Sequence, residues 1–438
     1  MYLTRRFYVA ALVVVLLLGS GQWYAPLFVA GKVALCVWVL AAAVDVALLY
    51  AGGARLDGVR RCADRLSNGD DNPVRLEVTN DGRLPLRVTV VDEAPVEFQR
   101  RDLSFRFRLL PGGQETSVYT LRPVRRGEYR FGHMRLFAST TWAGLVERRF
   151  TVGVPSVVKV YPSYLMLRHY ELLAIHNHLT DLGIKRIRRV GHQTDFEHIR
   201  DYVQGDDYRT VNWKATARRH QLMVNVYRDE RSQQVYNLID KGRVMQQTFG
   251  GMTLLDYAVN ASLVFSYVAI RREDKAGLVT FADHFETFVP ASRQEGQMTL
   301  LSESLYKERT AFGETDFSAL CVHLEKRVTK RSLAVLYTNF TTLVEARRQL
   351  PFLQNLSRRH CLLVVFFEDD DVRAYAASEA ATTEDYYRRV IAEKFIHEKR
   401  QIVALLKQHG IMALLTSPAR LTVDVINKYI EIKTRELL

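Results

Sequence analysis

Residues 235–281 have the sequence VYNLIDKGRVMQQTFGGMTLLDYAVNASLVFSYVAIRREDKAGLVTF, and this stretch decides the fold of the C-terminal half. An apolar run at 235–240 is followed by a helical stretch at 254–270 and then by a second apolar run, KAGLVTF. This order predicts a parallel βαβ unit, because parallel strands need a crossover connection. Asp256 and Asn260 interrupt the short helical stretch, so we expect a buried helix there and not a membrane span.

The alternation of strands and helices continues to the end of the chain. FETFVP forms a predicted hairpin with KAGLVTF, and SLAVLYTNF, CLLVVFFED and IMALLTS are predicted strands. The predicted helices are FSALCVHLEKRV, TLVEARRQLPFLQNL with an interruption at Pro351, YYRRVIAEKFIHEKRQIVALLKQHG and LTVDVINKYIEIKTREL. The pattern therefore predicts a doubly wound α/β domain over 233–438, with helices on both faces of its sheet.

The region before this domain has a different period. Between 65 and 160, segments such as NPVRLEVTNDG, LPLRVTVVDE and LSFRFRLLPGG alternate apolar and polar residues and end at turn residues. This pattern predicts a small antiparallel β-sandwich. It contains no catalytic spacing, so we interpret it as a structural or interaction module. Residues 161–232 form a connecting segment, with a helical stretch predicted over 163–179.

The N-terminal residues 1–55 are predicted to form a transmembrane helical hairpin, with spans at about 7–24 and 26–50. Arg5 and Arg6 precede the first span, and Arg55, Arg60 and Arg61 follow the second. The positive-inside rule therefore places both termini and the soluble domains in the cytoplasm. We expect the chain to lie in a bacterial cytoplasmic (inner) membrane and to contact membrane lipid. Four widely spaced cysteines fit this reducing compartment.

A patterned segment, 194–230, connects the two soluble domains. Thr194 and Glu197 have the spacing of a capping box, and Phe196, Ile199 and Val203 recur at helical spacing. Gly205 stands where a helix stop is expected. The segment therefore predicts a capped amphipathic helix over 194–205.

Opposed charges follow this predicted helix. They surround one tryptophan, and the residues concerned are Asp206, Asp207, Arg209, Trp213, Lys214 and Arg218. Paired charges of this kind serve either to lock two domains together or to dock a charged partner. The sequence leaves both interpretations open.

Three polar residues are expected at the carboxyl ends of the C-terminal strands, where open α/β sheets bind ligands: Asp240, Thr315 and Asn339. This layout resembles the von Willebrand factor A fold, whose metal-ion-dependent adhesion site uses Asp-x-Ser-x-Ser, a Thr and an Asp. The chain departs from that motif, since Gly242 and Val244 replace the serines and Asn339 replaces the last Asp. The resemblance implies a Mg²⁺ or Mn²⁺ site, which the loss of hard oxygen ligands weakens.

The segment GHQTDFEHIRDYVQGDDYRTVNWKATARRHQLMV resembles the domain-of-unknown-function 58 family. The matching elements are Phe-Glu-x-x-Arg-x-Tyr, Gly-Asp-Asp-x-Arg and Asn-Trp-Lys-x-x-Ala-Arg. Within them, the expected signature or interface residues are Glu197, Arg200, Tyr202, Gly205, Asp206, Asp207, Arg209, Trp213, Lys214 and Arg218. The resemblance implies MoxR-type AAA+ ATPases and other von Willebrand factor A-like membrane proteins as partners, and it implies no enzymatic activity.

These observations favour a membrane-anchored cytoplasmic adaptor or scaffold that works with a MoxR-type ATPase in the assembly or maturation of protein complexes. The alternative is a metal-dependent hydrolase that uses Asp240, Asp206 and Asp207, or a metal-dependent ligand-binding protein with a degenerate adhesion-type site. No P-loop, G-x-S-x-G elbow or HExxH helix supports an enzyme. The net charge of +13 comes from scattered residues rather than one basic face, which argues against nucleic-acid binding.

Overall fold

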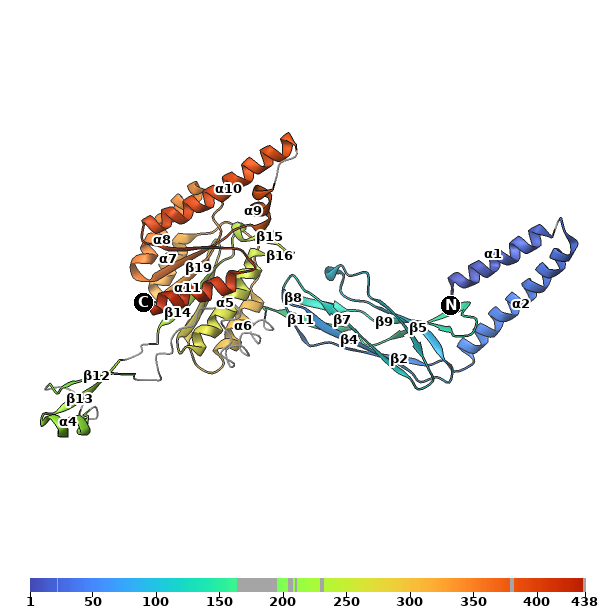
Figure 1. Cartoon of the computed structure of the whole chain (residues 1–438), viewed down its shortest axis with the longest axis horizontal. Helices are drawn as coiled ribbons and strands as arrows, with labels where there is room; N and C mark the ends of the chain where they lie inside the picture. The colour runs from blue at the N-terminus through green and yellow to red at the C-terminus, as the bar shows by residue number, and fades with distance from the viewer. Residues whose placement is uncertain are drawn as a thin grey trace. The chain divides into compact units, whose positions relative to one another are not determined.

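The computed structural model describes residues 1–21, 23–163, 195–203, 208, 211–228, 232–378 and 382–435, without the side chains of 25, 195–198 and 226–228. The chain divides into two compact units, Met1–Tyr164 and Leu165–Leu438. Figure 1 shows the helices and strands of each unit, and each unit is described by itself below.

Two apolar helices begin the first unit, α1 (Arg5–Ser20) and α2 (Ala25–Tyr50). They contact each other through the rings of Phe7 and Trp38, whose centroids are 4.6 Å apart. Within α2, Pro26–Tyr50 is long and apolar enough to cross a membrane. The predicted first span continued to residue 24, whereas α1 ends at Ser20 and has 16 residues.

A β-sandwich forms the rest of the first unit, and its strand pairs are antiparallel except β3 with β11. Its strands are β2 (Leu56–Arg61), β3 (Arg65–Ser67), β4 (Asn72–Asn80), β5 (Leu86–Asp92), β6 (Ser104–Leu109), β7 (Gln114–Leu121), β8 (Gly127–Phe131), β9 (Met134–Thr140), β10 (Val146–Val152) and β11 (Ser156–Tyr161). They form sheets of order β1-β10-β9-β5-β6, β2-β4-β7 and β3-β11-β8, where β1 is Tyr2–Leu3. The period of two is clear in β4, where Val74, Leu76 and Val78 point into the core and their neighbours point outward.

Residues Asp195–Asp201 form the strand β12, so the helix predicted from Thr194 is wrong. β12 pairs antiparallel with β13 (Met223–Arg228), and the short helix α4 (Trp213–Arg219) lies between them in the chain. A register shift between Phe196 and His198 adds a residue and breaks the two-residue period, which hid the strand in the sequence. A segment this short is also a poor helix without tertiary support. Thr194, Gly205 and the helix predicted over 163–179 fall outside the described residues, apart from Ser163.

The second unit contains a six-stranded sheet of order β18-β17-β14-β19-β20-β21. The strands are β14 (Gln234–Asp240), β17 (Lys275–Phe281), β18 (Phe285–Ser292), β19 (Leu333–Tyr337), β20 (Cys361–Phe367) and β21 (Met412–Thr416). All neighbours are parallel except the hairpin pair β17 and β18. A small two-stranded ribbon, β15 (Thr248–Phe249) and β16 (Met252–Thr253), follows β14.

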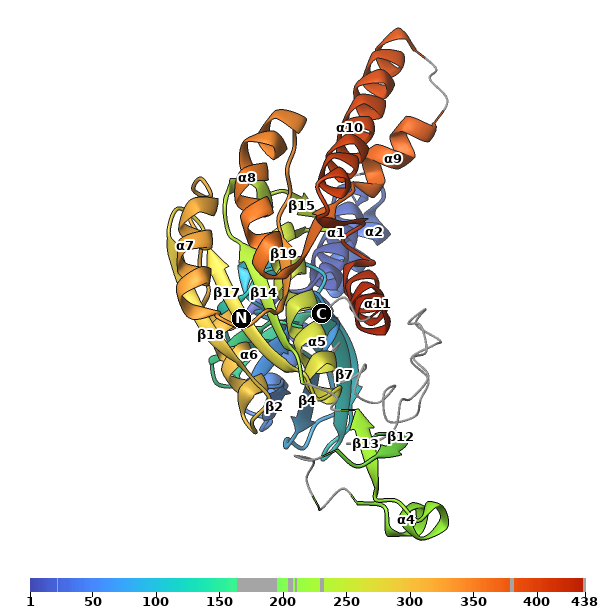
Figure 2. The ribbon, with the colours of Figure 1, turned by 90° about the vertical axis from the view of Figure 1, so that its left-hand side faces the viewer.

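Helices cover both faces of this sheet (Figure 2). One face carries α5 (Leu254–Arg271), α6 (Gln297–Lys307) and α11 (Leu421–Thr434), and the other carries α7 (Phe317–Arg327), α8 (Leu343–Arg359) and α10 (Thr383–Gln408). The short α9 (Asp370–Ala377) precedes α10. Because Val235 and Ile239 point to one face and Leu238 to the other, both faces of β14 are apolar, as the continuous apolar run requires.

The helix α8 runs through Pro351 without the predicted interruption. A proline removes one backbone hydrogen bond and crowds the preceding turn. Burial of Ala346, Leu353 and Leu356 against the sheet offsets that cost, so packing overrides the local preference.

Candidate functional site

The sheet order reverses direction between β14 and β19, which is where open α/β sheets place their ligand sites. β14 ends at Asp240, and Thr338 and Asn339 directly follow β19. The loop before α7 adds Thr315, whose hydroxyl donates to the Asp240 carboxylate. The structure therefore brings Asp240 and Thr315 together at this edge, with Asn339 on the neighbouring strand end.

Asp240 is fully buried, and its own chain satisfies both of its carboxylate oxygens. Oδ1 accepts from Thr315 Oγ1 at 2.7 Å and from the Gly242 amide at 2.8 Å, and Oδ2 accepts from Thr338 Oγ1 at 2.7 Å. Burial raises the pKa of the Asp240 carboxyl, although these hydrogen bonds lower it. Asp240 thus ties three loops together.

Gly242 leaves space that Thr315 fills. A Cβ placed on Gly242 would lie 1.9 Å from Thr315 Oγ1 and 3.0 Å from Asp240 Oδ1. The adhesion-type metal motif has a serine at this position, and no serine fits here while Thr315 keeps its place. The residues present therefore do not fit a Mg²⁺ or Mn²⁺ centre, because Gly242 and Val244 offer no side-chain oxygen where the motif has two serines.

Asn339 is held by a partly buried cation of the same chain. The Lys399 ammonium donates to Asn339 Oδ1 and, at 2.8 Å, to the Phe340 carbonyl, and Asn339 Nδ2 is 3.5 Å from Gln247 Oε1. Burial lowers the pKa of Lys399 to about 8, although the charge of Glu345 raises it. The oxygen that was expected as a metal ligand thus accepts from a lysine. Lys399 lies in the middle of α10, far along the sequence, and no local motif identified it.

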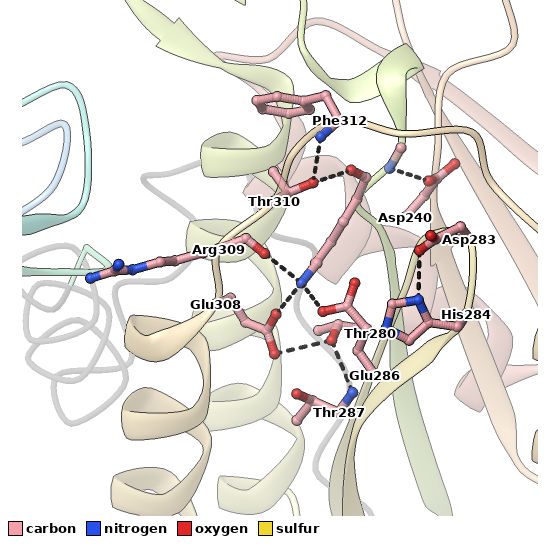
Figure 3. A network of polar contacts seen from close by, with 12 residues as sticks. Asp240, Thr280, Asp283, His284, Glu286, Thr287, Glu308, Arg309, Thr310 and Phe312 are labelled. Atoms are coloured by element: carbon pink, nitrogen blue, oxygen red, sulfur yellow. Dashed lines mark hydrogen bonds and ion pairs between the residues drawn. The ribbon is translucent and has the colours of Figure 1, made fainter.

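A second buried lysine follows Asp240 directly. Lys241 is 1% exposed, and its ammonium group pairs with Glu286 and, at 2.6 Å, with Glu308, and it donates to the Arg309 carbonyl at 2.8 Å (Figure 3). Thr280 Oγ1 donates to the other oxygen of Glu308 at 3.0 Å. The network joins β14, β17, β18 and the loop after α6, so its role is structural.

Near this network, Asp283, His284 and Glu286 lie within possible metal-ligand distance of one another, and Figure 3 shows Asp283 and His284 pointing toward each other. All three residues are exposed, and Glu286 already pairs with Lys241. An exposed acidic group of this kind is common without a metal, so we assign it no function.

A cleft of about 650 Å³ opens beside Asp240 at the carboxyl edge of the sheet. Its lining residues are Arg243, Val244, Gln247, Glu314, Thr341, Thr342, Val344, Glu345 and Arg348. Glu345 accepts from the Thr341 hydroxyl and amide. The guanidinium groups of Arg243 and Arg348 have no carboxylate partner in the described part of the chain. The cleft has charged walls, and no side chain in it is arranged as a nucleophile with a base.

The signature segment presents cations beside an exposed tryptophan. Trp213 is 70% exposed on α4, and Lys214 and Arg218 are exposed on the same helix. Asn212 caps this helix by accepting from the Ala215 amide, and Thr216 Oγ1 accepts from the Met223 amide of β13. Neither Lys214 nor Arg218 has a carboxylate partner among the residues that the structure describes. The short helix is therefore fixed to the β-hairpin while its charges face solvent.

Among the other signature residues, Arg200 lies on β12 and Tyr202 directly follows that strand. Arg200 donates to the neighbouring Asp201 carbonyl at 3.1 Å, and the rings of Tyr202 and Tyr208 lie 5.6 Å apart. The side chain of Glu197 and all of Gly205, Asp206, Asp207 and Arg209 fall outside the described residues.

Comparison with known proteins identifies a family match for part of the chain. The family model "Protein of unknown function DUF58" matches residues 198–374. The "Uncharacterized protein YeaD" of Bacillus subtilis is 27% identical over 243 residues, which are 52% of this chain and 60% of that protein. This chain thus spans about three fifths of the length of that relative.

Two solved structures are similar in part. The hypothetical protein BatB of Bacteroides thetaiotaomicron has a TM-score of 0.31 and 11% identity, covering 46% of this chain and 98% of that one. The CARDB domain of a Pyrococcus furiosus protein has a TM-score of 0.19 and 15% identity, covering 25% of this chain and 89% of that one. Both TM-scores are below 0.5.

Proposed function

We propose that the protein is a membrane-anchored cytoplasmic adaptor that works with a MoxR-type AAA+ ATPase in the assembly or maturation of protein complexes. The observation that carries this proposal is the α4 surface, defined here as Trp213, Lys214 and Arg218. Tryptophan and arginine dominate the binding energy of protein interfaces, and an exposed pair on a fixed hairpin needs little ordering to bind. Lys214 and Arg218 have no carboxylate partner among the described residues, which favours docking of an acidic partner surface over a lock between two domains.

The anchor in this proposal is a two-span hairpin. α1 begins and α2 ends at the same β-sandwich, because β1 pairs with β10 and Asp45 of α2 bonds the amides of Leu145 and Val146. If α2 crosses the bilayer, α1 must cross it in return. The part of α2 before Asp45 is about 30 Å long at 1.5 Å per residue, close to the hydrocarbon thickness, while α1 is shorter and requires local thinning.

The orientation follows from the charges at the two ends of the hairpin. Arg5 and Arg6 lie at the sandwich end of α1, and Arg55 follows α2 there, whereas exposed Trp23 and Tyr24 lie at the opposite turn. Arginines favour the cytoplasmic side, and aromatic rings favour the interface. The proposal therefore places the sandwich, the C-terminal domain and both termini in the cytoplasm of a bacterial inner membrane.

The C-terminal domain is von Willebrand factor A-like in this proposal, with other proteins of that kind and the ATPase as its partners. The sheet order and the ligand edge between β14 and β19 support that assignment. The metal-dependent alternative gains no support here, because Thr315 fills the space beside Gly242 and Lys399 occupies the Asn339 oxygen. Mg²⁺ or Mn²⁺ should leave the melting temperature unchanged; a shift that Asp240→Ala removes would restore the alternative.

Co-purification from native membranes tests the proposal. The double variant Lys214→Glu, Arg218→Glu should lose the ATPase from the captured complex, while its circular dichroism spectrum and melting temperature stay those of the wild type. The matched control is Lys330→Glu, Arg347→Glu, which reverses two exposed charges elsewhere in the second unit and should retain the ATPase. Equal recovery with all three proteins would refute docking through the α4 surface.

A further inference from the structure

The turn between β9 and β10 is the point where both N-terminal helices meet the sandwich. Thr4, which caps α1, donates from Oγ1 to the Gly144 carbonyl at 2.8 Å. Asp45 of α2 accepts from the Leu145 amide at 2.6 Å and from the hydroxyl of Thr140. This turn is therefore fixed at the base of the hairpin, where a bilayer crossed by the helices would end.

Two arginines from different elements converge on this turn. Nη1 of Arg6, in the first turn of α1, and Nη1 of Arg87, on β5, lie 3.6 and 3.9 Å from the position that a Cβ on Gly144 would take. Neither guanidinium has a carboxylate partner in the described part of the chain. Two positive charges beside the same turn repel each other, and a bridging anion offsets that cost. Guanidinium groups match the oxygens of a phosphate geometrically, so a phosphate fits this position.

Aromatic side chains lie on the same turn and at the ends of the adjoining elements. Trp142, in the same β9–β10 turn, is 67% exposed, and Tyr2 and Tyr50 are partly exposed beside the helix ends. Arg148 stacks on the Tyr50 ring at 4.7 Å and donates to the Leu49 carbonyl at 2.7 Å. Tryptophan, tyrosine and arginine together are the residues that prefer the headgroup layer of a membrane.

We propose that Arg6, Arg87 and Trp142 form a binding site for the headgroup of an anionic phospholipid. The phosphate lies between the two guanidinium groups, and the Trp142 ring inserts beside it at the level of the ester groups. The β-sandwich thus rests against the inner leaflet. The site depends on the proposed insertion of the hairpin and is independent of ATPase docking.

Fluorescence quenching in nanodiscs tests the site with the full-length protein. Trp142 is kept as the sole tryptophan by changing Trp23, Trp38 and Trp213 to Phe. Nanodiscs contain phosphatidylcholine and phosphatidylglycerol in one fixed ratio, and either the first or the second lipid is brominated. Brominated phosphatidylglycerol should quench Trp142 more strongly, which reports its enrichment at the site.

The double variant Arg6→Gln, Arg87→Gln should reduce that enrichment on the order of tenfold, since each basic residue near the surface contributes to anionic lipid binding. The control Arg75→Gln, Arg130→Gln changes two exposed arginines on β4 and β8 of the sandwich and should keep the enrichment. Equal quenching by the two lipids in the wild type, or equal loss in both variants, would overturn the site.

Two further arms separate the possible causes of a negative result. Flotation with phosphatidylcholine vesicles reports insertion alone: insertion without preference for phosphatidylglycerol rejects the lipid site and leaves the anchor intact, and failure to insert rejects both. Inorganic phosphate, compared with chloride at equal ionic strength, should not change the quenching ratio. Competition by phosphate would assign the arginine pair to a soluble anion and would refute the lipid site.

Discussion

The space occupied by Thr315 leads to a sharp prediction at Gly242. The backbone of Gly242 has φ −74° and ψ 179°, which any residue can adopt, so alanine there causes no backbone strain. Its Cβ would nevertheless lie 1.9 Å from Thr315 Oγ1. Gly242→Ala must therefore displace Thr315 and remove its hydrogen bond to the buried Asp240 carboxylate.

The expected loss has two parts. Overpacking in a closed site costs about 1–3 kcal/mol, and a lost hydrogen bond to a buried polar group costs a similar amount. We expect Gly242→Ala to destabilise the C-terminal domain by about 3 kcal/mol. Gly242→Ser combined with Thr315→Ala should recover most of this loss, because the serine hydroxyl can take the vacated place and donate to Asp240.

Hydrogen exchange of the full-length protein in detergent measures this change without assuming two-state unfolding. Amides of β14 and β19 should exchange on the order of 100-fold faster in Gly242→Ala, because about 1.4 kcal/mol corresponds to a factor of ten. Gly313→Ala is the matched control in the loop that carries Thr315. A Cβ on Gly313 would have no atom within 4 Å, so this variant should leave exchange nearly unchanged. Wild-type exchange in Gly242→Ala, or no recovery in the double variant, would refute this description of the closed site.

Three other changes follow from the buried charges. Lys241→Met should destabilise the protein by about 3–5 kcal/mol, because two carboxylates lose the cation between them. Chemical denaturation measures this change. A free energy of unfolding close to that of the wild type would contradict the network. The pKa of Lys399 is about 8 in the folded protein and 10.5 in the unfolded chain. Between these two values the unfolded state binds more protons than the folded state. The free energy of unfolding attributable to Lys399 should therefore rise from pH 8 to 10.5. Lys399→Met should remove that rise, and an unchanged pH profile would exclude the lowered pKa. Asp45→Ala should lower the free energy of unfolding by about 2–4 kcal/mol, because two buried amides lose their acceptor. Limited proteolysis should then cut the β9–β10 turn faster than in the wild type. Equal cutting would show that Asp45 does not hold the hairpin.

The strands and helices of the C-terminal domain were predictable because their patterns of apolar residues are regular over the whole length of each segment. The run 235–240 is apolar on both faces, and it lies at the centre of the sheet as such a run requires. The alternation around Val74 likewise indicated a half-exposed strand of the sandwich. These elements depend on local patterns that one sequence displays.

The features that the sequence did not reveal depend on distant partners. β12 pairs with β13 and contains a bulge, which breaks the two-residue alternation expected of a strand. The apolar residues of the segment therefore followed helical spacing. Lys399 donates to Asn339 across 60 positions of the chain. Arg6 and Arg87 lie near the same turn only when α1 and β5 both pack against it. No spacing rule encodes these contacts, because tertiary packing creates them.

Sequence reasoning placed Asp240 and Thr315 at one edge of the sheet, and the structure joins them by a hydrogen bond. It could not show that Thr315 occupies the space of the missing serine side chain at Gly242. The polar residues of the site were thus visible in the sequence. Their arrangement depends on the loop before α7, which places Thr315 in the space beside Gly242.

Site-specific photo-crosslinking at position 213 tests the central claim most directly. A photoreactive phenylalanine analogue replaces Trp213 in the full-length protein in native membranes, and the control carries it at the exposed position 330. We predict that position 213 forms an adduct with a MoxR-type ATPase and that position 330 forms none. Absence of that adduct at 213 while the ATPase is present in the membranes, or equal adducts at both positions, would contradict docking through the α4 surface.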